Sequence, residues 1–183
     1  MPKDYAPSPQ PVILGFLMLG PAHPYELFKE FERDLGQVWR VGRASLYARL
    51  KRAEEEGLVE VEVAEAERAP DRRVHRITEA GRVAFLAWLG GTSESVRDIR
   101  LEFLARLYFF RRLGPGEREG MEGQGGLEQA VSLQKAALAS RIAALERGIS
   151  EAAAANDEFR RLVLEFRRSE ARAAIEWLDA CIP

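Results

Sequence analysis

Residues 44–63 read ASLYARLKRAEEEGLVEVEV, and the spacing of their apolar side chains changes along the stretch. Leu46, Leu50 and Ala53 recur four and three positions apart, which predicts an amphipathic helix that ends at Gly57. After this glycine, valines alternate with glutamates, which predicts a strand with one buried face. The stretch therefore joins a short helix to the first strand of a hairpin, and this order decides the fold.

The flanking sequence supplies the other elements of a small domain. The apolar run at 12–19 predicts a buried helix, and Pro24 begins an amphipathic helix that stops at Gly36. Downstream, residues 72–78 (RRVHRIT) predict the second strand, and their final threonine is a good N-cap for a helix that ends near Leu89. Three short helices followed by a two-stranded hairpin indicate a winged helix-turn-helix.

The C-terminal half is predicted to be entirely helical. Residues 90–95 (GGTSES) have the composition of a turn and linker, so we predict two domains, 1–90 and 91–183. The second domain is predicted to hold helices over 98–113, 127–155 and 158–180, with a glycine-rich interruption at 114–126. The fold class is thus mainly α, a winged helix-turn-helix with a two-stranded wing followed by an all-helical dimerisation domain. Apolar stripes on the long helices predict the dimer, and the alternative is that they pack only within one chain.

Composition and charge exclude several classes of protein. The 183 residues carry a formal net charge of −2, so any surface that binds nucleic acid must arise from local clustering of charge. A single cysteine cannot form an internal disulfide, and the two distant histidines lack the spacing of a zinc site. No catalytic motif is recognisable, so we expect no enzymatic activity, no cofactor and no bound metal. The polar N-terminus and the lack of a long apolar run predict a cytoplasmic protein without a membrane partner.

Positive charge gathers at two places in the first domain, the helix before Gly57 and the second strand of the hairpin. Residues 35–53 contain five arginines and lysines and no acidic residue, whereas glutamates crowd residues 54–67. If the apolar residues of the helix face the core, then Ala44, Ala48 and Lys51 point away from it. The two small side chains would let this helix approach the floor of a DNA major groove.

The predicted DNA contacts lie on this helix and on the hairpin. The alanines are suited to thymine methyl groups, and the polar and basic side chains are suited to phosphates. The hairpin arginines are expected to reach the DNA backbone or an adjacent minor groove. The predicted set is Arg43, Ala44, Ser45, Tyr47, Ala48, Lys51, Arg52, Arg72 and Arg73. The alternative is that this basic face is merely solvated.

Three strings of sequence together resemble the PadR family of bacterial transcriptional regulators. They are ILGFLMLGPAHPYEL at 13–27, ASLYARLKRAEEEGLVE at 44–60 and RRVHRITEAGR at 72–82. The resemblance implies a winged-helix domain, a helical dimerisation domain, and action as a repressor whose DNA affinity responds to a small molecule or another signal. A two-fold dimer would read a palindromic operator. The other interpretation is a winged-helix protein-interaction module without specific DNA binding.

Three positions differ from the usual pattern of the family. Pro24 stands where glycine is common, Ala48 where proline often stands, and His75 where tyrosine is common. Proline suits the first turn of a helix, and the other two changes are expected to alter DNA specificity while the fold is kept. His75 shares a strand face with Ile77, so we expect a core position, and His23 is expected to be a structural residue where a helix begins.

An effector pocket is a further hypothesis. Aromatic side chains suit planar apolar ligands. The predicted pocket residues are Phe103, Tyr108, Phe110 and Trp177, with Phe109 beside them in sequence. The alternative is that these side chains form an ordinary core.

Overall fold

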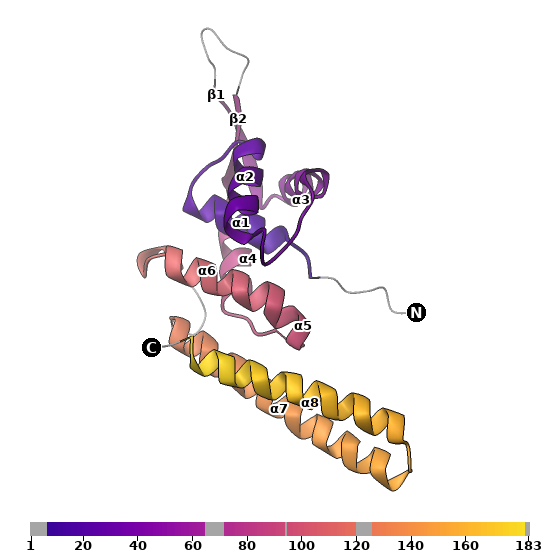
Figure 1. Cartoon of the computed structure of the whole chain (residues 1–183). Coiled ribbons are helices and arrows are strands. Elements are labelled where there is room, and N and C mark those ends of the chain that lie inside the picture. The colour runs from indigo at the N-terminus through magenta and orange to yellow at the C-terminus, as the bar shows by residue number, and fades with distance from the viewer. Residues whose placement is uncertain (1–6, 65–71, 94, 120–125, 182–183) are drawn as a thin grey trace. The chain divides into compact units, whose positions relative to one another are not determined.

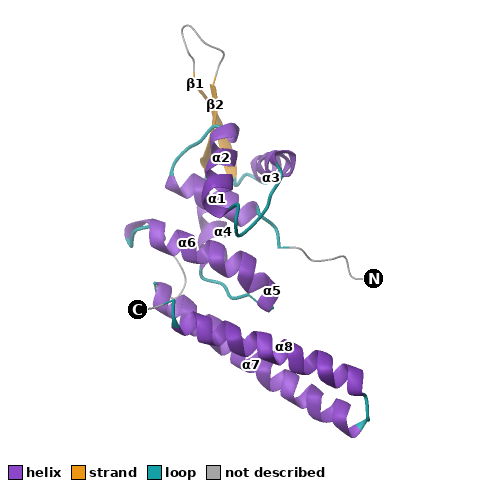
Figure 2. Cartoon of the chain, viewed as in Figure 1, coloured by secondary structure: helices purple, strands orange, loops and turns teal. Residues whose placement is uncertain are grey.

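Figure 1 shows the computed structural model of the chain, which describes residues 7–64, 72–93, 95–119 and 126–181. The first elements are α1 (Gln10–Leu19), α2 (Pro24–Leu35), α3 (Arg43–Glu55), β1 (Val59–Ala64), β2 (Arg72–Ile77) and α4 (Glu79–Leu89). They are followed by α5 (Val96–Asp98), η1 (Ile99–Phe103), α6 (Leu104–Arg112), η2 (Gly116–Arg118), α7 (Leu127–Ala154) and α8 (Glu158–Asp179). Over the described ranges the chain is mainly helical with one two-stranded sheet, which confirms the predicted fold class (Figure 2).

The first four helices and the hairpin form because local sequence and core packing agree. α1 is buried along residues 12–17 and packs against α2, α3, α4 and β2. The predicted helix starts are confirmed, since His23 Nδ1 accepts a hydrogen bond from the Tyr25 N–H at 3.2 Å and caps α2. Thr78 Oγ1 accepts from the Gly81 N–H at 3.1 Å and caps α4 in the same way. These elements build the winged helix-turn-helix.

The chain divides into two compact units. The first comprises Met1–Gly91 with Leu104–Gln124, and the second comprises Thr92–Phe103 with Gly125–Pro183. This division differs from the predicted split at residue 90, because α6 belongs to the first unit and not to the second.

Phe109 on α6 explains this difference. Its ring is fully buried and makes edge-on contacts with Phe16 on α1 and Phe85 on α4, at centroid distances of 5.5 and 5.2 Å. Gly15 leaves the room for it, since a Cβ at that position would lie 2.7 Å from both Cε atoms of the Phe109 ring. An aromatic residue from beyond the linker therefore completes the core of the first unit.

The helix predicted over 98–113 is interrupted. α5 begins after Ser95, whose Oγ accepts the Asp98 N–H at 3.2 Å, and the chain then passes through η1, which is π-helical. A π turn hydrogen-bonds one residue further along than an α turn, so one continuous α-helix does not form. In the glycine-rich stretch, the described residues contain a single 3-10 turn, η2, in agreement with the predicted interruption.

The second unit is built on the paired helices α7 and α8, which lie side by side (Figure 1). Val131, Leu138 and Leu145 of the predicted apolar seam on α7 are buried. The segment before α5 is joined to α7 by two hydrogen bonds, because the Ser93 N–H donates to Gln134 Oε1 at 2.7 Å and Gln134 Nε2 donates to the Ser93 carbonyl at 3.0 Å. Among the helices described, none combines the length and apolar character needed to cross a membrane.

Candidate nucleic-acid interface

α3 carries the surface that is predicted to contact DNA. The helix begins after Gly42 and buries Leu46, Leu50 and Ala53, as predicted. Because these apolar residues occupy one side, the opposite side is exposed to solvent. The exposed residues include every predicted helix contact, Arg43, Ala44, Ser45, Tyr47, Ala48, Lys51 and Arg52. We call this set the α3 face.

Two ion pairs lie along the last turns of the α3 face. Lys51 Nζ is 3.6 Å from Glu55 Oε1, and Arg52 Nε donates to Glu56 Oε1 at 2.8 Å. Gln10 on α1 donates from Nε2 to the other Glu56 oxygen at 2.6 Å. These hydrogen bonds, first that of Arg52 and then that of Gln10, lower the pKa of the Glu56 carboxyl below its usual value. Both cations of the α3 C-terminal turns therefore have carboxylate partners.

The pairing of these carboxylates with Lys51 and Arg52 was not predicted, although part of the signal is visible in the sequence. Each acidic residue follows its cation by four positions, the spacing that brings side chains together on a helix. Gln10 is different, because 46 positions separate it from Glu56 and no local pattern joins them. Only the packing of α1 against α3 shows that contact.

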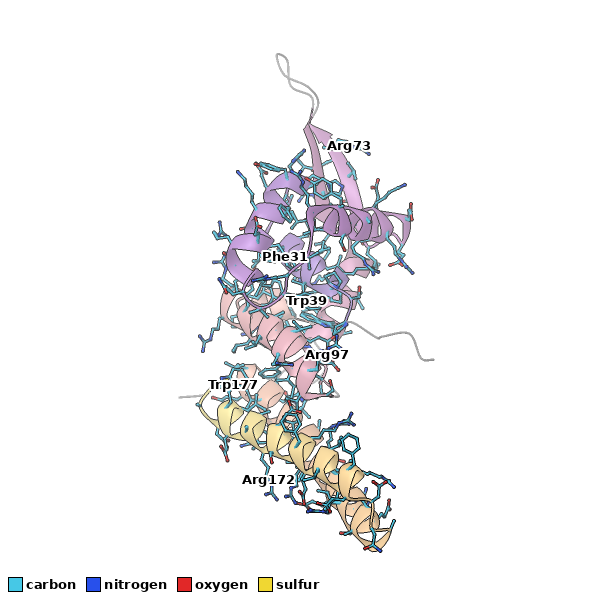
Figure 3. All side chains as sticks on the ribbon, turned by 45° about the vertical axis from the view of Figure 1, so that its right-hand side comes forward. Phe31, Trp39, Arg73, Arg97, Arg172 and Trp177 are labelled. Carbon is cyan, nitrogen blue, oxygen red and sulfur yellow. The ribbon has the colours of Figure 1, made fainter. Side chains whose placement is uncertain are left out.

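The hairpin of β1 and β2 forms the predicted wing. Val63 lies opposite Arg73, and the Arg73 side chain is exposed on β2 (Figure 3). Arg76 is also exposed, but its guanidinium lies 3.0 Å from Glu62. Arg72 begins β2, and its side chain lies outside the described residues. Of the wing arginines whose side chains are described, Arg73 is the one without an ion pair, so it is free to contact a phosphate.

A groove of about 770 Å³ lies between α3, β2 and the start of α2. It is lined by His23, Pro24, Tyr47, Leu50, Lys51, Glu54, Glu55, Arg73 and His75. Lys51 from the helix and Arg73 from the wing thus share one concave surface. Cations placed in this way can follow a sugar–phosphate backbone and fix the register of a protein on DNA.

His75 occupies a core position, as predicted. It is 7% exposed, and its backbone exchanges hydrogen bonds of 2.9 and 3.0 Å with Ala22, which ties β2 to the segment before α2. Its Nδ1 is buried and has no hydrogen-bond partner within the described part of the chain. Burial lowers the pKa of the His75 imidazole, with a further lowering by Arg73 and His23 and an opposing effect from Glu54.

We expect acidification to destabilise the first unit through His75. Because the folded pKa lies below the unfolded value, the unfolded chain binds more protons between the two values, and the free energy of unfolding falls as the pH drops below about 6.5. His75→Phe keeps an aromatic ring and removes the titrating group. Thermal unfolding at about pH 7.5 and about pH 5.5 should therefore show a larger drop in Tm for the wild type than for His75→Phe. Equal drops would assign the acid sensitivity to other groups.

The four predicted effector residues are divided between the two units. In the second unit, Phe103 and Trp177 pack edge to face with ring centroids 6.2 Å apart. In the first unit, the Tyr108 hydroxyl donates to Asp34 Oδ2 at 2.6 Å, and Phe110 is 6% exposed. Each of these side chains has a packing or hydrogen-bonding role within its own unit, and the effector pocket stays a prediction.

Comparison with known proteins gives one family match and one curated relative. Residues 13–87 match the sequence model described as "Transcriptional regulator PadR-like family". The chain is 25% identical over 105 residues to the negative transcriptional regulator PadR of Bacillus subtilis (strain 168). That alignment covers 57% of this chain and spans 58% of the length of the relative. The matched family region begins in α1 and ends in α4, and therefore contains α3 and the wing.

Two solved structures are similar over most of their length. One is the crystal structure of Bacillus subtilis PadR in complex with operator DNA, which is 20% identical, with a TM-score of 0.45 and coverage of 93% of each chain. The other is the same protein in complex with p-coumaric acid, which is 20% identical, with a TM-score of 0.43 and coverage of 97% of this chain and 95% of that chain.

Proposed function

We propose that the chain is a PadR-like transcriptional regulator that represses transcription by binding a palindromic operator as a homodimer. The match of residues 13–87 to the PadR-like family model supports this proposal. The exposed α3 face is the observation that carries this proposal. A recognition helix reads base edges in the major groove, mainly through its N-terminal residues. Ala44 and Ala48 would allow close approach there, and Arg43 at the helix start would reach a base or a phosphate. The proposed contacts are the α3 face with Arg72 and Arg73.

Repression is proposed from the curated relative, whose name describes a negative regulator. A protein that occupies an operator near a promoter excludes polymerase from it. The regulator would act in the cytoplasm, where its DNA lies. A reporter gene behind the upstream sequence of the chain's own gene should be less active when the protein is present, and equal activity would remove the repressor assignment.

The homodimer is proposed to form through α8. Phe159, Leu162 and Phe166 are 78%, 51% and 65% exposed and lie three and four positions apart, on one face of the helix. We call them the α8 stripe. Large apolar side chains grouped on a surface mark interaction sites. A second copy of the chain is the occupant we propose, because a two-fold axis pairs one surface with itself and supplies the second recognition helix for a palindrome.

A response to a small-molecule signal is a further part of the proposal, and the match of residues 13–87 to the PadR-like family model supports it. A small planar ligand would change DNA affinity by binding one state of the dimer better than another. A ligand screen followed by tryptophan fluorescence and by operator affinity tests this part. If no compound changes either signal, the effector is removed from the proposal.

Retention of DNA distinguishes operator binding from a protein-interaction module. The duplex upstream of the chain's own gene is immobilised, and the protein is eluted with salt in the presence of random competitor DNA. If the protein binds an operator, it should stay on this duplex at competitor concentrations that elute it from a duplex of scrambled sequence. Equal elution from both duplexes would instead favour the interaction module.

Lys51→Ala and Arg73→Ala are each expected to weaken binding to all DNA sequences. Loss of one phosphate contact should reduce the slope of log affinity against log salt by about one unit. Arg76→Ala is the matched control, because Arg76 is an exposed arginine of the same hairpin but does not line the groove that Lys51 and Arg73 share. Fluorescence anisotropy at several salt concentrations gives both quantities. An unchanged slope would remove the substituted residue from the contact set.

A further inference from the structure

The side of α3 that is proposed to contact DNA ends in an acidic residue. Ala44, Ala48, Lys51 and Glu55 follow one another by four, three and four positions, so they lie on one side of the helix. Glu55 is exposed and lines the same groove as Lys51 and Arg73. A surface proposed to meet phosphates therefore carries a carboxylate within reach of its own cations.

Glu56 is the second carboxylate, and it is held from two sides. One oxygen accepts from Arg52 Nε at 2.8 Å and the other from Gln10 Nε2 at 2.6 Å. The pKa of Glu56 is lowered by these donors, so the group is charged at neutral pH. A guanidinium that already donates to a fixed carboxylate has to exchange that charge-assisted hydrogen bond before it can donate to a phosphate.

We propose that Glu55 and Glu56 restrain DNA binding by competing with DNA phosphates for Lys51 and Arg52. The inference rests on the proposed function, since it requires that the α3 face meets DNA. Affinity for DNA of arbitrary sequence depends almost wholly on phosphate contacts. Two cations that are engaged by carboxylates therefore lower this affinity directly. The restraint keeps the regulator from being held by bulk DNA, and Gln10 acts as a positioning residue that keeps Glu56 on Arg52.

Glu55→Gln and Glu56→Gln test the competition on a duplex of random sequence. Each substitution keeps the size of the side chain and removes its charge. An exposed ion pair is worth little, so each variant should bind about two- to fivefold more tightly. The salt slope should also become steeper, by a fraction of a unit for each variant, because a cation without its carboxylate contacts a phosphate for a larger share of the time. The matched control is Glu32→Gln on α2, which changes the charge of the same unit at an exposed residue with no ion pair among the described residues.

Two further variants separate competition from a general charge effect. Gln10→Ala changes no charge, yet it should tighten DNA binding, by a smaller factor than Glu56→Gln does, because Glu56 is then held by Arg52 alone. In an Arg52→Gln background, Glu56→Gln should give no gain, because no cation remains to be released. The proposal is overturned if this gain persists without Arg52, if Glu32→Gln matches Glu56→Gln, or if Glu55→Gln and Glu56→Gln bind like the wild type.

Failure of the inference and failure of the proposed function are distinguishable. Wild-type protein that retains its operator over scrambled DNA, with unchanged Glu55→Gln and Glu56→Gln variants, would overturn the inference alone. Wild-type protein that binds neither duplex would overturn both. Unfolding of each variant by urea, compared with the wild type, establishes that the affinities belong to folded protein.

Discussion

Replacement of Phe109 with alanine is expected to lower the free energy of unfolding of the first unit by about 3–5 kcal/mol. The ring is fully buried and makes edge-on contacts with Phe16, Phe85, Trp88 and Tyr108. Rigid rings from three different helices cannot collapse into the space that it leaves, so the lost contacts are not recovered. Urea unfolding followed by circular dichroism measures the change. A loss below about 1 kcal/mol would show that the cavity closes.

Gly15→Ala provides the complementary test of the same packing. Its new Cβ would lie 2.7 Å from both Cε atoms of the Phe109 ring, and this overpacking should cost about 1–3 kcal/mol. In a Phe109→Ala background the methyl group meets empty space, so the cost should disappear. The double-mutant cycle then gives a coupling energy of the same size as the Gly15→Ala penalty. Additive effects would contradict the contact between α1 and α6.

Phe166→Glu is expected to convert the proposed homodimer to monomers and to weaken binding to the proposed operator by about a hundredfold or more. A two-fold axis repeats the substitution on both sides of the interface, so two charges enter an apolar contact. A dimer gains affinity because its second half-site binds at a high effective concentration, and a monomer loses this gain, which is about 10²–10⁴. Phe166 is 65% exposed in the single chain, so the substitution should not disturb the folding of the chain. Light scattering at micromolar concentration and anisotropy on the operator measure the two effects.

Val83→Glu is the matched control for this experiment. Val83 is 59% exposed on α4, and the substitution introduces the same charge at another apolar surface position. It should leave the proposed homodimer intact. Phe166→Glu protein that remains a dimer with full operator affinity would exclude the α8 stripe as the interface.

Local sequence determined most of the winged helix-turn-helix. Leu46, Leu50 and Ala53 are buried as their spacing predicted, because a helix turns its side chains to one side at fixed intervals. His75 is buried for the corresponding reason in a strand, where alternate side chains face the core. Thr78 begins α4 as predicted, because a cap acts on backbone groups only a few residues away. All of these features depend on interactions within one element or one turn, which a periodic pattern records.

The tertiary structure alone decided the features that join distant segments. Phe109 completes the core of the first unit because Gly15 leaves space for its ring on another helix. No residue spacing within α6 predicts this contact. The hydrogen bond from Gln10 to Glu56 and the groove shared by Lys51 and Arg73 likewise require that separate elements pack together. Periodicity specifies which side of an element is buried, but the partner of that side depends on shape and volume across the whole core. The sequence by itself therefore determined the elements, their caps and the exposed α3 face. The packing of separate elements decided the contact of Gln10 with Glu56 and the place of the Phe109 ring against α1 and α4.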